Sequence, residues 1–138
     1  MHIHPNPDAF AALVRNHPDG PVVMLNLLRF RAEADYSASP ELAPDTPISG
    51  AAAYKRYARH ATPLLTEAGS EVLWAGLASA TLIGPVDERW DHVLLVRHRS
   101  VADFIAFASN RAYLAGLGHR TAALADSRLV PVRQTKGL

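Results

Sequence analysis

Polar residues able to do chemistry interrupt apolar stretches of this chain, and Asn26 is the clearest case. It stands at the centre of the apolar run Val22–Phe30. A buried amide left without hydrogen-bond partners costs about 1–3 kcal/mol, so Asn26 must have partners. It can orient a carbonyl or hydroxyl group of a ligand in a pocket. The alternative is an amide paired with neighbouring backbone or with a dimer contact.

Aromatic and basic side chains supply further candidates for ligand binding. Tyr54 and Tyr57 are three residues apart, which places both hydroxyl groups on one helical face. They can line a cavity, or they can be core residues with hydroxyls at its rim. Trp74 and Trp90 can line an apolar ligand site or pack in the core. Arg97 can hold a carboxylate, although an arginine at a strand end usually extends to solvent.

The C-terminal half carries a second group of candidates. Tyr113 and Arg120 are seven residues apart and share a face if their helix is unbroken. Arg120 can pair with Asp126 or bind an acidic ligand group. His60 and His119 are candidate acids or bases because histidine titrates near neutral pH. A surface role is the alternative for each histidine.

The seven histidines do not form a metal motif. None has the His-x-x-x-His or Glu-x-x-His spacing of a helical site. His2 and His4 alternate in a leader that we expect to be mobile, and His92 and His98 are too far apart to converge alone. No nucleophile elbow, phosphate-binding loop or Gly-x-Gly-x-x-Gly motif occurs. We therefore expect neither a metal nor a cofactor.

Composition describes an ordinary globular protein. The chain has 138 residues, 49% of them apolar, no cysteine and a formal net charge of +1. One domain over residues 1–138 fits this length. The low charge argues against a nucleic-acid partner. The lack of a signal peptide or a long apolar run predicts no membrane association and, by default, a cytoplasmic location.

Turn residues, caps and apolar periodicity divide the chain into elements. Asn6, Ser49, Ser100 and Asn110 are the expected helix caps. Pro63 must kink or divide its helix, and Gly76 is a candidate bulge. The expected elements are a helix over 7–16, a strand over 22–30, a long loop over 32–49, a helix over 50–68, strands over 71–83 and 90–98, a helix starting at 101, a helix over 111–125 and a short strand over 127–132.

After the N-terminal extension over residues 1–19, this order predicts an α+β fold of the ferredoxin-like βαββαβ type. Its antiparallel sheet would carry the helices on one face. The first three strands are apolar on both faces, whereas a sheet with one wet face should alternate. We therefore expect a homodimer in which a second copy covers the free sheet face.

Short motifs along the chain match a known family. They are Val22–Phe30 with Asn26 at its centre, Tyr54 with Tyr57, His98-Arg99-Ser100, Asn110-Arg111-Ala112-Tyr113, Arg120, and Asp126-Ser127. Together they resemble the domain of unknown function 1330 (DUF1330) family, in the dimeric α/β-barrel superfamily. The resemblance implies a ferredoxin-like dimer with a pocket between sheet and helices. That superfamily also includes small monooxygenases, lyases and isomerases.

Two functional hypotheses follow. The first is a cofactor-independent monooxygenase or isomerase acting on an apolar or aromatic carbonyl compound. In it, Asn26 and Tyr57 orient the substrate and His119 or Arg120 handles charge. The further binding contacts would be Tyr54, Trp74, Arg97 and Tyr113. The second is a non-catalytic dimer that binds a small molecule or only itself, because the sequence has no strong catalytic constellation.

Overall fold

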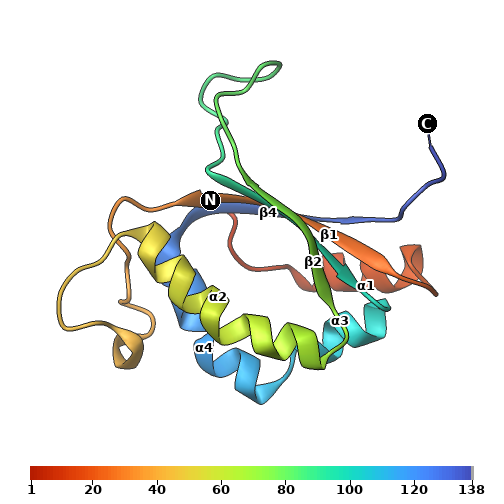
Figure 1. Ribbon diagram of the computed structural model, residues 1–138, viewed down its shortest axis with the longest axis horizontal. Helices are drawn as coiled ribbons and strands as arrows, with labels where there is room; N and C mark the ends of the chain where they lie inside the picture. Colours follow the sequence, from red (N-terminus) through yellow and green to blue (C-terminus); the bar gives the residue numbers. More distant parts are fainter. Residues whose placement is uncertain (138) are drawn as a thin grey trace.

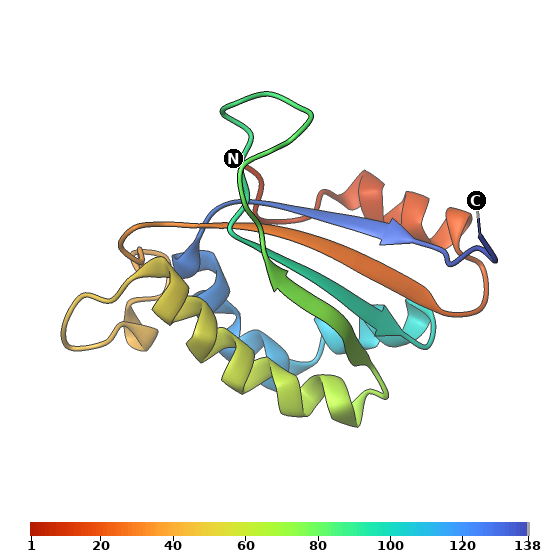
Figure 2. The same ribbon diagram turned by 45° about the horizontal axis from the view of Figure 1, so that its top comes forward.

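Helices pack against one face of a four-stranded sheet in the computed structural model, which describes residues 1–137 (Figures 1 and 2). The elements in chain order are α1 (Pro7–Asn16), β1 (Val22–Phe30), the short 3-10 helix η1 (Pro40–Leu42), α2 (Gly50–Glu67), β2 (Glu71–Leu77), β3 (His92–His98), α3 (Val101–Ala108), α4 (Arg111–Ala123) and β4 (Leu124–Val132).

The sheet has the strand order β2-β3-β1-β4, and every neighbouring pair is antiparallel. With α2 between β1 and β2, and with α3 and α4 between β3 and β4, this is the predicted ferredoxin-like fold. β1 and β3 are therefore the two central strands of the sheet.

Local sequence signals set the helix starts as predicted. In each case the side chain of the capping residue accepts a hydrogen bond from a backbone N–H in the first turn, which would otherwise have no partner. The pairs are Asn6 with Ala9, Ser49 with Ala52, Ser100 with Asp103, and Asn110 with Ala112 and Tyr113. Gly69 follows α2 with a positive φ of 74°, a backbone conformation that glycine adopts readily at a helix end.

Pro63 does not divide α2, which continues to Glu67. A proline removes one backbone hydrogen bond inside a helix, so packing must compensate. Ala61 belongs to a core cluster with Tyr113 of α4, and Leu64 and Leu65 pack against it. This contact between α2 and α4 holds the helix together across the proline.

β2 is shorter than expected and its irregularity lies elsewhere. The strand ends at Leu77 instead of Ile83, and the register shifts between Val72 and Trp74, not at Gly76. A Cβ at position 76 would overlap the indole ring of Trp74, a half-exposed side chain that has room to move aside. The expected bulge at Gly76 is therefore wrong.

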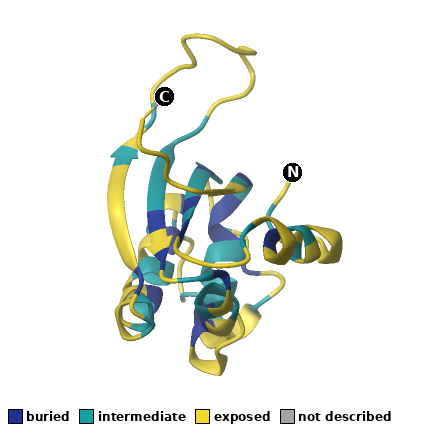
Figure 3. Cartoon of the chain, turned by 90° about the vertical axis from the view of Figure 1, so that its right-hand side faces the viewer, coloured by how far each residue is buried: buried dark blue, intermediate teal, exposed yellow. Residues whose placement is uncertain are grey.

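The connection between β2 and β3 is longer than the predicted turn. Residues 78–91, which we call the arm, leave the sheet on the side away from the helices (Figures 1 and 3). Asp91 lies outside β3 because it caps the end of β1: its N–H donates to Leu28 O at 2.7 Å and its carboxylate accepts from Phe30 N at 2.8 Å.

β4 is longer than predicted. It begins at Leu124, directly after α4, and a register shift beside Arg29 and Phe30 accommodates the start of the strand. The end of α4 and the start of β4 are therefore both earlier in the chain than the sequence indicated.

Alternate residues of β1 point to opposite faces of the sheet. Met24 and Leu28 lie in the core clusters on the helix side, so Asn26 also points toward the helices. Val23, Leu25 and Leu27 point the other way. No helix of residues 1–137 covers that face of the sheet (Figure 3). We call this the open face; its apolar residues are Val23, Leu25, Leu27, Trp74, Val93, Leu95, Val130 and Val132.

Candidate functional site

An incompletely covered row of side chains crosses the helix-facing side of the sheet at Asn26. Its register partners are Leu94 on β3 and Leu129 on β4, and Ala75 on β2 extends the row beyond Leu94. Leu129 is 44% exposed, whereas Met24, two residues before Asn26, is 2% exposed. Met24 and Leu28, on either side of Asn26 along β1, are therefore buried more completely than the row itself.

Asn26 has a local partner in this row. Its Nδ2 donates to the carbonyl oxygen of Met24 at 3.1 Å, and the side chain is only partly buried. An amide has a second N–H and a carbonyl oxygen in addition. The geometry thus leaves Asn26 able to bind a further polar group at the centre of the row.

Tyr54 and Tyr57 of α2 meet Tyr113 of α4 beside the same part of the core. The Tyr57 and Tyr113 hydroxyl oxygens form a hydrogen bond of 2.9 Å, and the rings of Tyr54 and Tyr57 lie 5.2 Å apart. Leu94, the neighbour of Asn26, packs against the cluster that includes Tyr54. The expected pairing of the tyrosines along one helical face is therefore present, extended by a third tyrosine from α4.

These tyrosines belong to a continuous row of aromatic rings between sheet and helices. Each neighbouring pair has ring centroids between 4.4 and 6.4 Å apart, the range of favourable aromatic contact. The order is His92, Phe30, Tyr54, Tyr57, Tyr113, Phe107, His98 and Phe104. The row runs from one end of β3, at His92, to the other end, at His98, and gives each of the three tyrosine rings an aromatic neighbour on both sides.

Burial keeps the tyrosine hydroxyls protonated. It raises the pKa of Tyr54 to about 12 and raises the pKa of Tyr57 further, and the positive charge of Arg120 opposes this only partly. In a pair of hydroxyls, one proton joins the two oxygens and the other remains free. The cluster can therefore donate a hydrogen bond to an oxygen atom of a ligand, but it is a poor base at neutral pH.

Arg120 faces the N-terminal leader instead of Asp126. Its Nη1 donates to the carbonyl oxygen of Ile3 at 3.0 Å, and Asp126 is ion-paired with Arg128 at 2.8 Å. The expected alternative of an Arg120–Asp126 pair is therefore wrong. β4 directs Asp126 to the open face, opposite Arg29, whereas Arg120 lies on the helix side.

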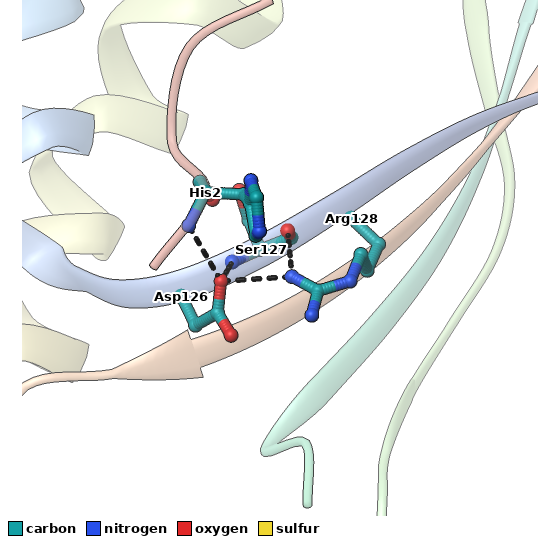
Figure 4. A network of polar contacts seen from close by, with 4 residues as sticks. All are labelled: His2, Asp126, Ser127 and Arg128. Carbon is teal, nitrogen blue, oxygen red and sulfur yellow. Dashed lines mark hydrogen bonds and ion pairs between the residues drawn. The ribbon is translucent and has the colours of Figure 1, made fainter. Parts of the chain in front are cut away.

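The leader is anchored, contrary to the expectation that it is mobile (Figure 4). His2 N donates to the Asp126 carboxylate at 2.7 Å, and the Ser127 hydroxyl donates to His2 O at 2.6 Å. Burial alone would raise the pKa of Asp126, but the hydrogen bonds from His2, Arg128 and Ser127 lower it below its usual value. The ionised carboxylate thus holds the start of the chain against β4.

His119 lies in a different polar group, formed with the long loop. Its Nδ1 is joined to the Tyr36 hydroxyl by a hydrogen bond of 2.7 Å. Burial, followed by the positive charges of Arg56 and His60, lowers the pKa of His119, so the ring is neutral near pH 7. The loop over residues 32–49 therefore packs onto α4 through Tyr36, which is 9% exposed.

Two of the predicted ligand contacts lie on the open face, away from the tyrosines. Trp74 is 55% exposed and pairs in register with Leu95. Arg97 forms an exposed ion pair of 3.3 Å with Glu71. The structure therefore brings together Tyr54, Tyr57 and Tyr113 beside the Asn26 row, but it places Trp74 and Arg97 on the other layer.

Two hollows lie on or beside the open face. One, of about 440 Å³, is polar and is lined by Arg29, Pro85, Asp87, Glu88, Arg89, Trp90, Asp126 and Arg128. The other, of about 510 Å³, is lined by Asp19, Gly20, Pro21, Val23, Arg97, Arg133, Gln134, Thr135 and Lys136. In the first hollow the guanidinium group of Arg128 lies 5.0 Å from the centre of the Trp90 ring.

Sequence reasoning missed two buried polar contacts. Tyr36 gave no signal because it stands in a stretch without periodicity. The Ser70 hydroxyl and His98 Nδ1 form a hydrogen bond of 2.8 Å, and both residues are buried. Only the alternation of β3, which places His98 on the same face as Val96, could have indicated a histidine in the core.

Two features are absent from residues 1–137. They contain no group of three or more histidine, aspartate or glutamate side chains placed to hold a metal ion. None of the helices described here has the length and apolar character needed to cross a membrane.

The fold and the layer of buried tyrosines define a ferredoxin-like α+β protein. The chain belongs to the family called domain of unknown function (DUF1330), which matches residues 45–134. The RPA0582 protein of unknown function from Rhodopseudomonas palustris is 38% identical, with a TM-score of 0.87, and the match covers 99% of this chain and 98% of that one.

More distant structures share the fold alone. A dimeric ferredoxin-like protein of unknown function from Bacteroides fragilis is 14% identical with a TM-score of 0.52, over 84% of this chain and 98% of that one. A NIPSNAP domain protein from Burkholderia xenovorans is 12% identical with a TM-score of 0.53, over 83% and 95%. No curated protein matches the chain.

Proposed function

We propose that this protein is a homodimer that binds a small apolar or aromatic compound bearing a carbonyl or carboxylate group. The ligand would lie on the helix side of the sheet, over the row centred on Asn26. The incompletely covered row is the observation that carries the proposal. It joins apolar side chains of three strands to one amide that has unused hydrogen-bonding groups.

The neighbouring polar groups favour an oxygen-bearing ligand. The Tyr57–Tyr113 pair has one proton free to donate, and Arg120 supplies a fixed positive charge near the tyrosines. Neutral hydroxyls and a guanidinium group recognise carbonyl and carboxylate oxygens. A reaction on such a compound, by a monooxygenase or isomerase without a cofactor, is the finer form of the proposal, with His119 as the candidate base.

The dimer is supported by the open face. Its apolar residues include Val130, 43% exposed, and Trp74, 55% exposed. Apolar surface of this kind, continuous over neighbouring strands, is unfavourable in water and is normally covered by a partner. Light scattering at micromolar concentration should give twice the mass of the chain, and a pure monomer would contradict the dimer.

A thermal-shift titration with benzoate, phenylacetate and acetophenone tests the binding site. We expect saturable stabilisation of the wild type and a loss of the response in Tyr57→Phe. Arg120→Gln should weaken binding of the two carboxylates more than that of acetophenone, because only the carboxylates need the charge. Val14→Ser, at an exposed position of α1 outside the Asn26 row and the open face, is the control and should respond like the wild type.

Asn26→Leu separates binding from structure. Leucine removes the amide from an apolar row, so the variant should be as stable as the wild type or more stable, and it should not bind the probes. If the stable variant binds them as the wild type does, or if no probe stabilises the wild type, the proposed site is wrong.

A further inference from the structure

The arm carries the most exposed apolar side chains of the described residues. Leu82 is 97% exposed, Ile83 is 92% exposed and Val86 is 98% exposed. These three side chains contact almost nothing in their own protomer. An exposed group of large apolar residues marks a surface that another molecule covers.

The arm is nevertheless a formed structure. At its base, Ala78 N donates to Asp91 O at 3.0 Å. Near its tip, the Thr81 hydroxyl donates to Glu88 O at 2.8 Å, and Glu88 N donates to Pro85 O at 3.2 Å. A preformed arm loses little conformational freedom on binding, which favours docking as a unit.

The base of the arm and the second hollow lie at opposite ends of the open side. The base of the arm follows Leu77, which lies in register with His92 and, across β3, with Leu28. The hollow of about 510 Å³ includes Val23 and Arg97, which face each other at the other end of β1 and β3. Five residues of strand separate these ends, or about 17 Å.

The arm tip and this hollow are complementary in charge as well as in polarity. The hollow is lined by Arg133 and Lys136, by Arg97, which is ion-paired with Glu71 at 3.3 Å, and by the acid Asp19, and it also includes the apolar side chains of Pro21 and Val23. The arm places Asp87 and Glu88 directly after Val86, and Arg89 follows them, so these three charged residues together carry one net negative charge. An apolar group with adjacent carboxylates fits an apolar floor with adjacent cations.

We propose that each arm docks into the hollow of the partner protomer, and this inference rests on the proposed homodimer. Two-fold symmetry with β1 running in opposite directions in the two sheets brings each arm to the far end of the other open face. Both contacts then form at once, because the interface of a two-fold dimer is the same on each side. Leu82, Ile83 and Val86 would cover the apolar floor, and Asp87 and Glu88 would meet the basic side chains.

Crosslinking between single-cysteine variants tests the arm directly, because the natural chain has no cysteine. Ile83→Cys on the arm is mixed with Gln134→Cys in the hollow, exchanged through brief denaturation, and treated with a short bismaleimide. A covalent dimer should form in this mixture. A mixture of Ile83→Cys with Ala51→Cys, an exposed position on α2, is the matched control and should give none.

A second set of variants measures the contribution of the arm to assembly. Replacing Leu82, Ile83 and Val86 together by serine should raise the dimer dissociation constant at least tenfold. Secondary structure should be unchanged because these side chains are exposed within the protomer. Val14→Ser and Leu114→Ser, about half exposed on helices, are controls that should leave dimerisation unaffected.

The outcomes distinguish the two proposals. A wild-type dimer that gives no arm-to-hollow crosslink and keeps its affinity in the serine variant would overturn the arm contact and leave the homodimer intact. A wild-type monomer in light scattering would overturn both. Charge reversal gives a further criterion. The double variant Asp87→Lys with Glu88→Lys should dimerise more weakly than the wild type. A mixture of this double variant with the Arg133→Glu protein should form a mixed dimer of restored affinity.

Discussion

The hydroxyl oxygens of Tyr57 and Tyr113 lie 2.9 Å apart although 56 residues separate them in the chain. The bond connects α2 to α4. Two apolar helices could pack in several registers, whereas a buried hydroxyl pair has one arrangement in which both oxygens have a partner. The pair therefore fixes how α2 and α4 pack against each other.

Removing either hydroxyl leaves the other without its partner. Tyr57→Phe and Tyr113→Phe should each lower the free energy of unfolding by about 1–2 kcal/mol. The double variant should lose less than the sum, because the second substitution removes the orphaned hydroxyl. Urea denaturation of the four proteins measures the coupling, and strictly additive losses would contradict a direct bond in solution.

His98 should make stability depend on pH. Burial among Phe104, Phe107 and β3 lowers the pKa of His98 to about 4, against an ordinary value of 6.5. The folded state thus prefers the neutral ring, so its contribution is complete above pH 6.5 and is lost as the pH falls toward 4. The slope in this range should approach one proton, or at most about 1.4 kcal/mol per pH unit.

The variant His98→Phe with Ser70→Ala isolates this effect. It removes the titrating ring and the hydroxyl that pairs with it, and it retains an aromatic ring between Phe104 and Phe107. Urea unfolding between pH 4 and 7 should show a flatter pH dependence than in the wild type. An unchanged slope would assign the pH dependence to other groups.

Gly50 has no room for a side chain. A Cβ at this position would collide with the carbonyl oxygen of Arg31 and would lie 2.7 Å from that of Ala123. Both obstacles are backbone atoms and cannot rotate away. Gly50→Ala should therefore cost about 3 kcal/mol or more, the upper end of overpacking penalties.

Ala51→Gly is the comparison for that substitution. Ala51 is the next residue of α2 and is exposed, so the change should cost only the helix propensity of alanine, about 1 kcal/mol. Thermal unfolding of both variants makes the comparison, and a Gly50→Ala protein as stable as Ala51→Gly would contradict the close packing.

Asp126 should control the N-terminal leader. Asp126→Asn removes the charge that holds His2 N and Arg128. Amide hydrogen exchange of residues 2–4 should accelerate in this variant, and lowering the pH through the depressed pKa of Asp126 should have the same effect in the wild type. Asp8→Asn, an exposed acid in α1, should leave the exchange of the leader unchanged.

The positions of helix starts could be predicted because their cause is local. Asn6, Ser49, Ser100 and Asn110 each bond backbone groups within three residues, so the signal is complete in a short stretch of sequence. The alternation in β1 likewise determined which residues share a face with Asn26, although not which layer covers that face.

Strand ends could not be predicted because they depend on partners distant in the chain. Leu82 and Ile83 have the composition of a strand, but no other segment of residues 1–137 pairs with them. Leu124 joins β4 because β1 offers Phe30 as a partner. The third tyrosine and the Tyr36–His119 contact are also products of tertiary packing, so spacing could not reveal them.

The aromatic residues are sorted by layer, and this gives the protein two independent optical signals. Both tryptophans lie on the open side, Trp74 on β2 and Trp90 beneath Arg128. Tyr54, Tyr57 and Tyr113 lie on the helix side. Tryptophan emission should therefore report contact between protomers, while tyrosine ultraviolet absorption should report occupancy of the Asn26 row, so that assembly and ligand uptake can be followed separately in one unlabelled sample.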